Sequence, residues 1–438
     1  MIRQYFFLMA IMIVFGCTKK QKHTSDLKNK DISALIGEMS SLMIHDVTNP
    51  PLAARFFSYA CLAGYEVVSQ NDTAFRSMHG IVKEYPSLKK PVIEGYDYPL
   101  AALLAMTETA KKMQPSGTQL ANFEKKIIDS LKRNGLEEDV VKQSQQYAQA
   151  ISKVILAYAK SDGYYKISNL PRYTPLNGEQ YWYPTPPGYF PAVEPYFTSV
   201  RSFFLDSSDQ FAPPQPTPYS RDKNSAFYKM LYNNYKQGES DLSDEHRLIA
   251  AYWDCNPFAM QDGGHLMVGL KKISPGAHWL GITGIACRNA KKTFNETMLI
   301  HALVAMGLMD SFIGCWNEKY TSNRVRPETA IRNIIDPHWK PLLQTPPFPE
   351  YLSGHSCISA TSQVILTKCI GDNFAFTDTM EVKFGLPRRN FTSFQQAAKE
   401  AAISRFYGGI HYMDAIDNGF VQGVKTGEWV LSKSSDLF

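Results

Sequence analysis

The chain has 438 residues, of which 44% are hydrophobic and 20% are charged, a composition typical of a folded protein with a large core and not of a disordered one. The formal net charge of +5 comes from the first 30 residues, because basic and acidic side chains balance in the remainder. This distribution argues against nucleic-acid binding through a broad basic face.

The first 16 residues have the form of a secretory signal peptide. A short basic start precedes the apolar run YFFLMAIMIVFG, which is too short to span a bilayer comfortably. The run ends in VFGC, which resembles the lipobox of bacterial lipoproteins, although Phe15 is bulkier than usual. The resemblance implies a lipidated Cys17, followed by a polar, lysine-rich tether over 17–30. We therefore expect an exported bacterial lipoprotein, periplasmic or at the cell surface and anchored to a membrane. The alternative is an uncleaved anchor or an ordinary signal peptide with a chance cysteine.

The next part of the chain, 31–222, is predicted to hold N-terminal helices and a wrapping loop. Apolar residues recur there at helical spacing, separated by turns rich in Pro, Gly, Asn or Asp. The predicted helices cover residues 31–47, 51–69, 98–113, 118–134 and 137–161. Residues 163–222 are dense in proline and aromatic side chains. They predict a long ordered loop around the body, because flexible linkers seldom carry so many aromatics.

The last part of the chain, 223–438, returns to helical patterns and shows no sustained strand alternation. Its most apolar stretch, 298–316, contains His301, Asp310 and Ser311, so we interpret it as a buried core helix and not as a membrane span. The predicted fold class is therefore all-α, with a single helical body over 31–438.

Six cysteines remain besides Cys17, and they are widely spaced without any CxxC pair. This spacing argues against a zinc site. One or two pairs could form disulfides in an oxidising compartment, and the alternative is that most are small buried hydrophobic residues.

The stretch KYTSNRVRPETAIR carries the first candidate cluster. Lys319 and Arg326 are seven residues apart, so on a helix they share a face and repel each other unless an anion lies between them. Arg324 and Arg332 are phased differently and are interpreted as solvated or structural. An ordinary exposed basic face is the alternative for Lys319 and Arg326 alone.

The stretch PPFPEYLSGHS carries the second cluster. A helix is predicted to begin at Ser353, an acceptable N-cap, and Gly354 allows a ligand to approach the backbone. Free amides at a helix start bind anions, and His355 can move a proton near neutral pH. Taken alone, this stretch indicates only a helix cap.

The third cluster lies around a predicted helix end at Gly408 and Gly409. Arg405 precedes this break and His411 follows it, so the break could let both side chains reach one point. A further helix follows, in which Gly419, Gly423 and Gly427 predict close packing against another helix.

Order and spacing of the three clusters, K-x6-R-P, S-G-H and S-R-x5-H, resemble the signature of the vanadium-dependent haloperoxidase and type-2 phosphatidic acid phosphatase superfamily. Stretches at 181–205, 252–265 and 306–327 are similar to bacterial haloperoxidase-like proteins, so the resemblance covers roughly residues 30–435. The signature positions are Lys319, Arg326, Pro327, Ser353, Gly354, His355, Ser404, Arg405 and His411. The resemblance implies a large helical bundle of the haloperoxidase and acid phosphatase type.

The resemblance also implies a bound cofactor, vanadate, with hydrogen peroxide and halide as substrates. His411 would then bind the vanadium, and His355 would act as acid and base. Lys319 would both hold an oxygen and polarise the peroxide. The equatorial oxygens would be held by Lys319, Arg326, Ser353, Gly354 and Arg405.

Phosphate has nearly the same shape and charge as vanadate, so a soluble acid phosphatase is the second hypothesis. In that case His411 would be the nucleophile attacking a phosphate ester, and His355 would protonate the leaving group. A non-catalytic anion-binding lipoprotein is the third. The body lacks predicted membrane-spanning helices, unlike integral lipid phosphatases, which favours the haloperoxidase. Phe348, five residues before Ser353, is weakly suggestive of the chloride-oxidising members and is otherwise a packed wall residue.

One position departs from the superfamily pattern. An aspartate commonly lies four residues after the last histidine and orients its ring, but this chain has Ala415 there. Asp414 and Asp417 are the nearby carboxylates, and the sequence leaves open which of them orients His411.

Overall fold

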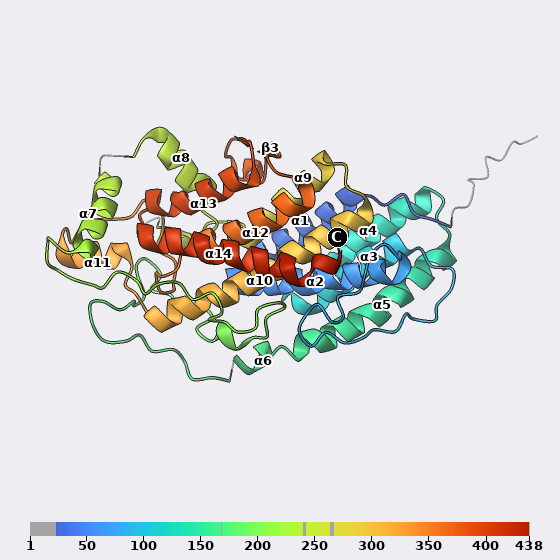
Figure 1. Ribbon diagram of the computed structural model, residues 1–438. Coiled ribbons are helices and arrows are strands. Elements are labelled where there is room, and N and C mark those ends of the chain that lie inside the picture. The colour runs from blue at the N-terminus through green and yellow to red at the C-terminus, as the bar shows by residue number, and fades with distance from the viewer. Residues whose placement is uncertain (1–22, 168, 240–241, 263–266, 438) are drawn as a thin grey trace, which may run out of the picture.

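Helices make up most of the computed structural model, which describes residues 23–167, 169–239, 242–262 and 267–437 (Figure 1). The predicted all-α class is confirmed. The expected signal peptide over 1–16 and the expected lipidation site Cys17 lie outside the described residues.

The five helices predicted in the N-terminal part are all present, with ends within four residues of their predicted positions. Their bounds are α1 (Asn29–His45), α2 (Pro50–Asn71), α3 (Tyr98–Met113), α4 (Leu120–Arg133) and α5 (Glu138–Lys160). The helical body was predicted to begin at residue 31, but the chain already contacts it at Ser25. The Ser25 amide and hydroxyl both donate to the Asp97 carboxylate, at 2.9 and 2.6 Å.

The proline-rich segment after α5 is an ordered loop that contains only short helical turns, α6 (Tyr164–Ile167) and η2 (Phe197–Ser199). Asp310 of the core fixes it: its carboxylate accepts the N–H groups of Phe203 and Phe204 at 2.7 Å and of Leu205 at 3.0 Å. Three backbone donors on one buried carboxylate explain why so proline-rich a segment stays against the body.

The C-terminal part contains the helices that position the candidate site. Their bounds are α7 (Ala226–Glu239), α8 (Asp244–Tyr252), α9 (Pro275–Asn289), α10 (Phe294–Ser322), α11 (Pro327–Ile334), α12 (Gly354–Ile370), α13 (Phe394–Tyr407) and α14 (Met413–Lys433), with short 3-10 turns η1 (Gly117–Gln119), η3 (Val382–Phe384) and η4 (Ser435–Leu437).

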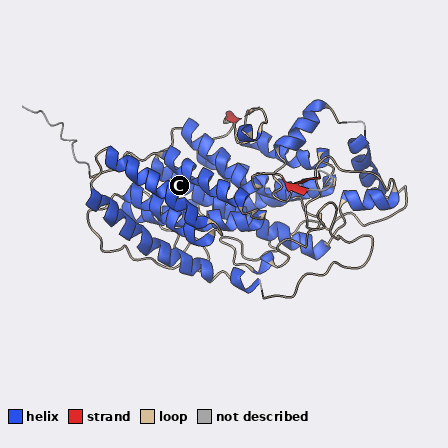
Figure 2. Cartoon of the chain, turned by 180° about the vertical axis from the view of Figure 1, so that it is seen from behind, coloured by secondary structure: helices blue, strands red, loops and turns tan. Residues whose placement is uncertain are grey.

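Two small antiparallel hairpins complete the described structure (Figure 2). One pairs β1 (Met260–Asp262) with β2 (Met267–Gly269), and the other pairs β3 (Phe376–Asp378) with β4 (Arg389–Phe391). Strands of three residues are too short to produce a recognisable alternation, so the sequence did not predict them.

Helix α10 lies at the centre of the body and packs against α2, α9, α12 and α14. It is long and apolar enough to cross a membrane, with a mean hydropathy of 1.7 over its best window, but that window is entirely buried inside the protein. The interpretation of residues 298–316 as a core helix is therefore confirmed.

Helices α12 and α14 pack with almost no space between their backbones. A Cβ atom added at Gly423 would lie 2.0 Å from the Cys357 carbonyl oxygen, and one at Gly427 would lie 2.7 Å from Cβ of Val364. The predicted close packing of the glycine row is confirmed. It fixes the start of α12, where Ser353 caps the helix by accepting the Ser356 amide hydrogen at 3.3 Å.

Candidate active site

A pocket lies where the second and third sequence clusters meet. Its polar side chains come from the start of α12, the end of α13 and the turn before α14, whereas its other walls are mostly apolar. The lining residues include Gly354, His355, Arg405 and His411, with Phe258, Phe312, Trp316 and Phe348 among the apolar ones.

The His411 ring is held on both nitrogens. Its Nδ1 lies 2.8 Å from Oε1 of Glu350, and its Nε2 lies 3.0 Å from Nη1 of Arg326. A guanidinium can only donate, so Nε2 is the acceptor and Nδ1 carries the hydrogen that bonds the carboxylate. Burial and then the nearby cations, Arg326 first, lower the pKa of His411 well below its usual value. The ring is therefore neutral and presents a lone pair at Nε2.

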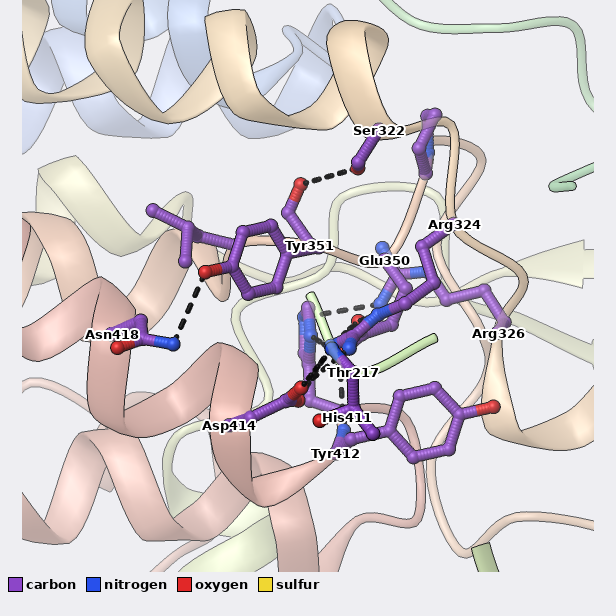
Figure 3. Close-up of polar contacts among 12 residues, drawn as sticks. Thr217, Ser322, Arg324, Arg326, Glu350, Tyr351, His411, Tyr412, Asp414 and Asn418 are labelled. Carbon is purple, nitrogen blue, oxygen red and sulfur yellow. Dashed lines mark hydrogen bonds and ion pairs between the residues drawn. The ribbon is translucent and has the colours of Figure 1, made fainter. Parts of the chain in front are cut away.

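Glu350, not Asp414 or Asp417, orients His411 (Figure 3). Besides the ring, the fully buried Glu350 carboxylate accepts the Tyr412 amide hydrogen at 3.0 Å and the Nε–H of Arg324 at 2.6 Å. Glu350 was not among the predicted site residues, because its bond to His411 joins positions 61 residues apart and no local pattern marks such a pair.

Asp414 forms an ion pair with Arg324 instead. Its two carboxylate oxygens each accept from the Arg324 guanidinium at 2.7 Å, while the same guanidinium contacts Glu350. Arg324 also lies over the Tyr351 and Tyr412 rings. It is therefore structural, one of the two alternatives left open for it. Asp417 is exposed.

Two of the predicted site residues, Arg326 and His355, each have a buried nitrogen atom without a partner among the described residues. Nε of Arg326 donates to the Phe348 carbonyl at 2.9 Å, and Nη1 reaches the Ile410 carbonyl at 2.8 Å and His411. Its Nη2 is buried and has no hydrogen-bond partner among the described residues. Burial lowers the pKa of Arg326 to about 10, so the guanidinium stays charged at neutral pH.

His355 has the second such atom. It lines the pocket from the first turn of α12, and its buried Nε2 finds no partner within the described part of the chain. Burial first, and then Arg405 and His411, lower the pKa of this imidazole well below its usual value. A hydrogen bond with the Trp253 backbone acts in the opposite direction.

Lys319 is fully buried near the pocket, but the geometric reason for its placement differs from the prediction. It does not share a helix with Arg326, because α10 ends at Ser322 and Arg326 is the N-cap of α11. Both cations lie against the Phe348 ring, at 4.9 and 5.1 Å. The prediction that Lys319 and Arg326 share a helical face was therefore wrong, although both side chains lie against the same phenylalanine ring.

The three N–H groups of Lys319 are already used. They donate to the carbonyl oxygens of Pro349 at 3.0 Å and Glu350 at 3.2 Å, and to that of Leu352. Burial lowers the pKa of this ammonium to about 8. Lys319 thus holds the loop before α12 and contributes its charge to the site from behind that loop.

Arg405 and Ser353 are also fixed by neighbouring groups. Nε of Arg405 donates to Oγ of Ser404 at 2.9 Å, and its Nη2 donates to the Trp253 carbonyl at 2.6 Å. Oγ of Ser353 accepts from Oγ of Ser356 at 2.9 Å, and the Ser353 amide donates to the Ala415 carbonyl at 3.1 Å. Ala415 therefore supports the start of α12 through its backbone.

The donor set fits a tetrahedral oxyanion. His355, Arg405 and His411 line a pocket that has few anionic groups of its own, and the cations Arg326 and Lys319 lie close to it. The unpaired Nη2 donor of Arg326 is costly when buried, and an anion that accepts from it removes the cost. The sequence left open whether some of the six cysteines besides Cys17 form disulfides. All six are free thiols, and five of them are buried.

Comparisons with known proteins find relatives of nearly the whole chain. The family model described as the VCPO second helical-bundle domain matches residues 299–438. The crystal structure of the first bacterial vanadium-dependent iodoperoxidase is 38% identical, with a TM-score of 0.88; the match covers 94% of this chain and 98% of that one.

Two further structures share the fold at lower identity. The apo form of a bacterial vanadium-dependent chloroperoxidase is 15% identical with a TM-score of 0.67, over 89% of this chain and 94% of that one. A holo form is 16% identical with a TM-score of 0.64, over 95% of each chain. No curated protein sequence matches the chain.

Proposed function

Because the chain belongs to the vanadium haloperoxidase superfamily, we propose that it is a vanadate-dependent haloperoxidase that uses hydrogen peroxide to oxidise halide. Iodide is the first halide to test, because the relative with 38% identity over nearly the whole chain is an iodoperoxidase. One observation carries the proposal: His411 and His355 line one pocket, and Arg326, whose Nη1 lies 3.0 Å from the unprotonated Nε2 of His411, has no partner for its Nη2 among the described residues.

His411 and Glu350 would provide the attachment point. The Glu350 carboxylate fixes the hydrogen on Nδ1, so Nε2 stays unprotonated. The Nε2 lone pair, which accepts from Arg326 Nη1 in this structure, would turn to the electrophilic centre when the anion binds. Vanadate bound there would supply a Lewis acid that activates peroxide without changing its own oxidation state.

Arg326, Arg405 and Lys319 would offset the charge of the anion, and the hydroxyl of Ser353 and the amide of Gly354 lie at the same helix start. The fixed donors need little rearrangement when charge develops on the anion, which is what makes such a site effective.

His355 would move the proton that peroxide loses on binding. Its depressed pKa leaves the imidazole neutral at pH 7, and a neutral imidazole can accept a proton through the unpartnered Nε2.

The test is an oxidation assay on the purified full chain with peroxide and iodide or bromide, with and without added vanadate. We expect halide oxidation that depends on vanadate and peroxide, and its loss in His411→Ala. Asp417→Asn, a carboxylate change on exposed surface, should keep the activity within about twofold. No halide oxidation at any vanadate concentration would contradict the proposal, and hydrolysis of p-nitrophenyl phosphate in its place would identify a phosphatase.

We also propose that the protein is exported and anchored to a membrane through a lipid on Cys17. The support is the VFGC stretch at the end of the apolar run, followed by a lysine-rich segment suited to an anionic membrane surface.

A further inference from the structure

A second buried polar cluster lies beside the pocket and takes no part in the proposed reaction. Cys255 follows α8, His278 belongs to the first turn of α9, and Glu381 immediately precedes η3. All three side chains are buried, and one potential ligand atom from each lies within 4.8 Å of the other two.

The His278 ring is the centre of this cluster, and its two nitrogens have different surroundings. Nε2 lies 2.7 Å from Oδ2 of the fully buried Asp378. Nδ1 lies 3.6 Å from Sγ of Cys255 and 3.4 Å from Oε1 of Glu381.

The Nδ1 atom cannot satisfy both neighbours by hydrogen bonding. It carries at most one hydrogen, so it can bond well to either the thiol or the carboxylate, but not to both. Within the described ranges, His278 is the only ion-pair partner of Glu381. A buried carboxylate with one long contact is costly, and burial accordingly raises the pKa of both Glu381 and Cys255.

We propose that Sγ of Cys255, Nδ1 of His278 and Oε1 of Glu381 bind a divalent transition metal ion of the zinc type. Zinc holds sulfur at about 2.3 Å and nitrogen or oxygen at about 2.0–2.1 Å in a tetrahedron, which places a sulfur and a nitrogen ligand about 3.6 Å apart and a nitrogen and an oxygen ligand about 3.4 Å apart. The two separations in the cluster match these values.

The surroundings of His278 also match those of a metal ligand. A metal-bound histidine commonly donates its other ring N–H to a carboxylate, as His278 Nε2 does to Asp378. On binding, bonds form from the metal to sulfur, nitrogen and oxygen, and the thiol and Nδ1 protons leave to solvent. The thiolate and the Glu381 carboxylate then balance the two positive charges.

The proposed ligands come from three separate segments, so a site of this kind would not require a CxxC pair. A metal there would join the segment after α8, α9 and the turn before η3. Cys255 also lines the oxyanion pocket, and the neighbouring Trp253 carbonyl accepts from Arg405. The metal would therefore fix one wall of the pocket.

The test uses the full chain and needs no enzymatic activity. The protein is stripped with a chelator and dialysed against Zn²⁺, and bound metal is measured by elemental analysis and by competition with a chromogenic chelator. We expect one ion per chain. Replacement by Co²⁺ should give a thiolate-to-cobalt charge-transfer band in the near ultraviolet.

Variants separate a built site from adventitious binding. Cys255→Ser and Glu381→Gln should lose the stoichiometric ion, and Asp378→Asn should weaken binding roughly 10–100-fold. Cys61→Ser is the matched control, because Cys61 is a buried thiol whose raised pKa comes from burial alone. It should bind metal like the unmodified chain.

Two results would overturn the proposal. One is the absence of stoichiometric metal and of the cobalt band in the unmodified chain, which requires no variant to fold. The other is retention of the ion by both Cys255→Ser and Glu381→Gln. Circular dichroism of each variant distinguishes loss of the site from loss of the fold.

Discussion

At the scale of single residues, the site depends on a buried chain of charges that begins at His411. Glu350 holds the imidazole, Arg324 holds Glu350, and Asp414 holds Arg324. Removing one member of such a network leaves another charge uncompensated, which typically costs about 3–5 kcal/mol. Conservative substitutions are therefore the informative ones.

Glu350→Gln should weaken vanadate binding and halide oxidation about 10–100-fold, because the amide holds the Nδ1 hydrogen of His411 less strongly than the carboxylate. Titration of the metal-free enzyme with vanadate measures the effect on affinity. Asp417→Asn should leave the titration unchanged. Equal loss in both variants would mean that Glu350 does not act through His411.

Gly354→Ala should keep the fold but reduce oxyanion affinity. The nearest atom to an added Cβ belongs to Trp316, at 3.7 Å, so the protein has room for the methyl group. That group would occupy the pocket that Gly354 lines, next to the proposed anion. Thermal unfolding should shift by less than a few degrees, whereas the vanadate concentration at half-maximal activity should rise. An unchanged half-maximal concentration would place the anion elsewhere.

The sequence predicted which residues gather at the pocket better than it predicted how they are held. His355, Arg405 and His411 line it, but Glu350 was missed because no local pattern marks a carboxylate that bonds a residue 61 positions away. Lys319 was placed correctly for an incorrect reason, since it reaches the site through three backbone carbonyls.

At the scale of elements, the predicted start of α12 at Ser353 and the predicted end of α13 at Gly408 match the observed helix ends, because a serine N-cap and a glycine C-cap are local signals. The two hairpins were not predicted, since strands of three residues owe their pairing to tertiary position. The loop after α5 was predicted as ordered, but its anchor, Asp310, could not be identified from spacing alone.

Gly423→Ala should lower the free energy of unfolding by about 1–3 kcal/mol, because the added methyl group collides with the Cys357 carbonyl between α12 and α14. Gly37→Ala is the matched control: it lies within α1, where an added Cβ meets nothing within 4 Å, so about 0.5–1 kcal/mol of stabilisation is expected. Denaturant unfolding of both variants measures the difference. Similar stability of the two would contradict the close helix contact.

Helix α10 contains two buried groups whose proton equilibria oppose each other. Burial lowers the pKa of His301 to about 4, so the unfolded chain, with a histidine pKa of about 6.5, binds the proton first. Stability from this group is therefore present above about pH 6.5 and is lost as the pH falls towards 4. Burial raises the pKa of Asp310 to about 6, so its protonation stabilises the fold over part of the same range.

His301→Leu should remove the destabilising half of this pair. Between pH 6.5 and 4, the free energy of unfolding should fall by about 2–3 kcal/mol less in the variant than in the unmodified chain. Urea unfolding at several pH values measures this difference. His338→Leu, a change at an exposed histidine, is the matched control. An identical pH dependence in His301→Leu would show that the buried imidazole is not the group that titrates.

At the scale of the whole molecule, the family signature and the helical periodicity were sufficient to predict the fold class. All the signature residues lie between 319 and 411, inside the segment matched by the family model. The N-terminal half provides the wrapping loop and contributes Pro50 to the pocket lining, and the similarity to the iodoperoxidase extends over this half as well.

Cys17→Ser should release the full-length protein from membranes in a bacterial host, because the substituted residue cannot accept the proposed lipid. Fractionation and radiolabelled palmitate incorporation measure the change, with Cys369→Ser as a control thiol in the folded body. Equal membrane partition of both variants would contradict a lipid anchor at Cys17.

The position of Trp316 gives the pocket an optical reporter. Its indole lines the pocket, its Nε1 donates to the Val193 carbonyl at 3.1 Å, and its ring lies 5.6 Å from the Lys319 ammonium. An indole held so firmly has one electrostatic environment, and an anion arriving beside it changes the field across the ring. Because the chain has six tryptophans, we expect the part of the emission that comes from Trp316 to change with occupancy of the pocket, in solution and without turnover.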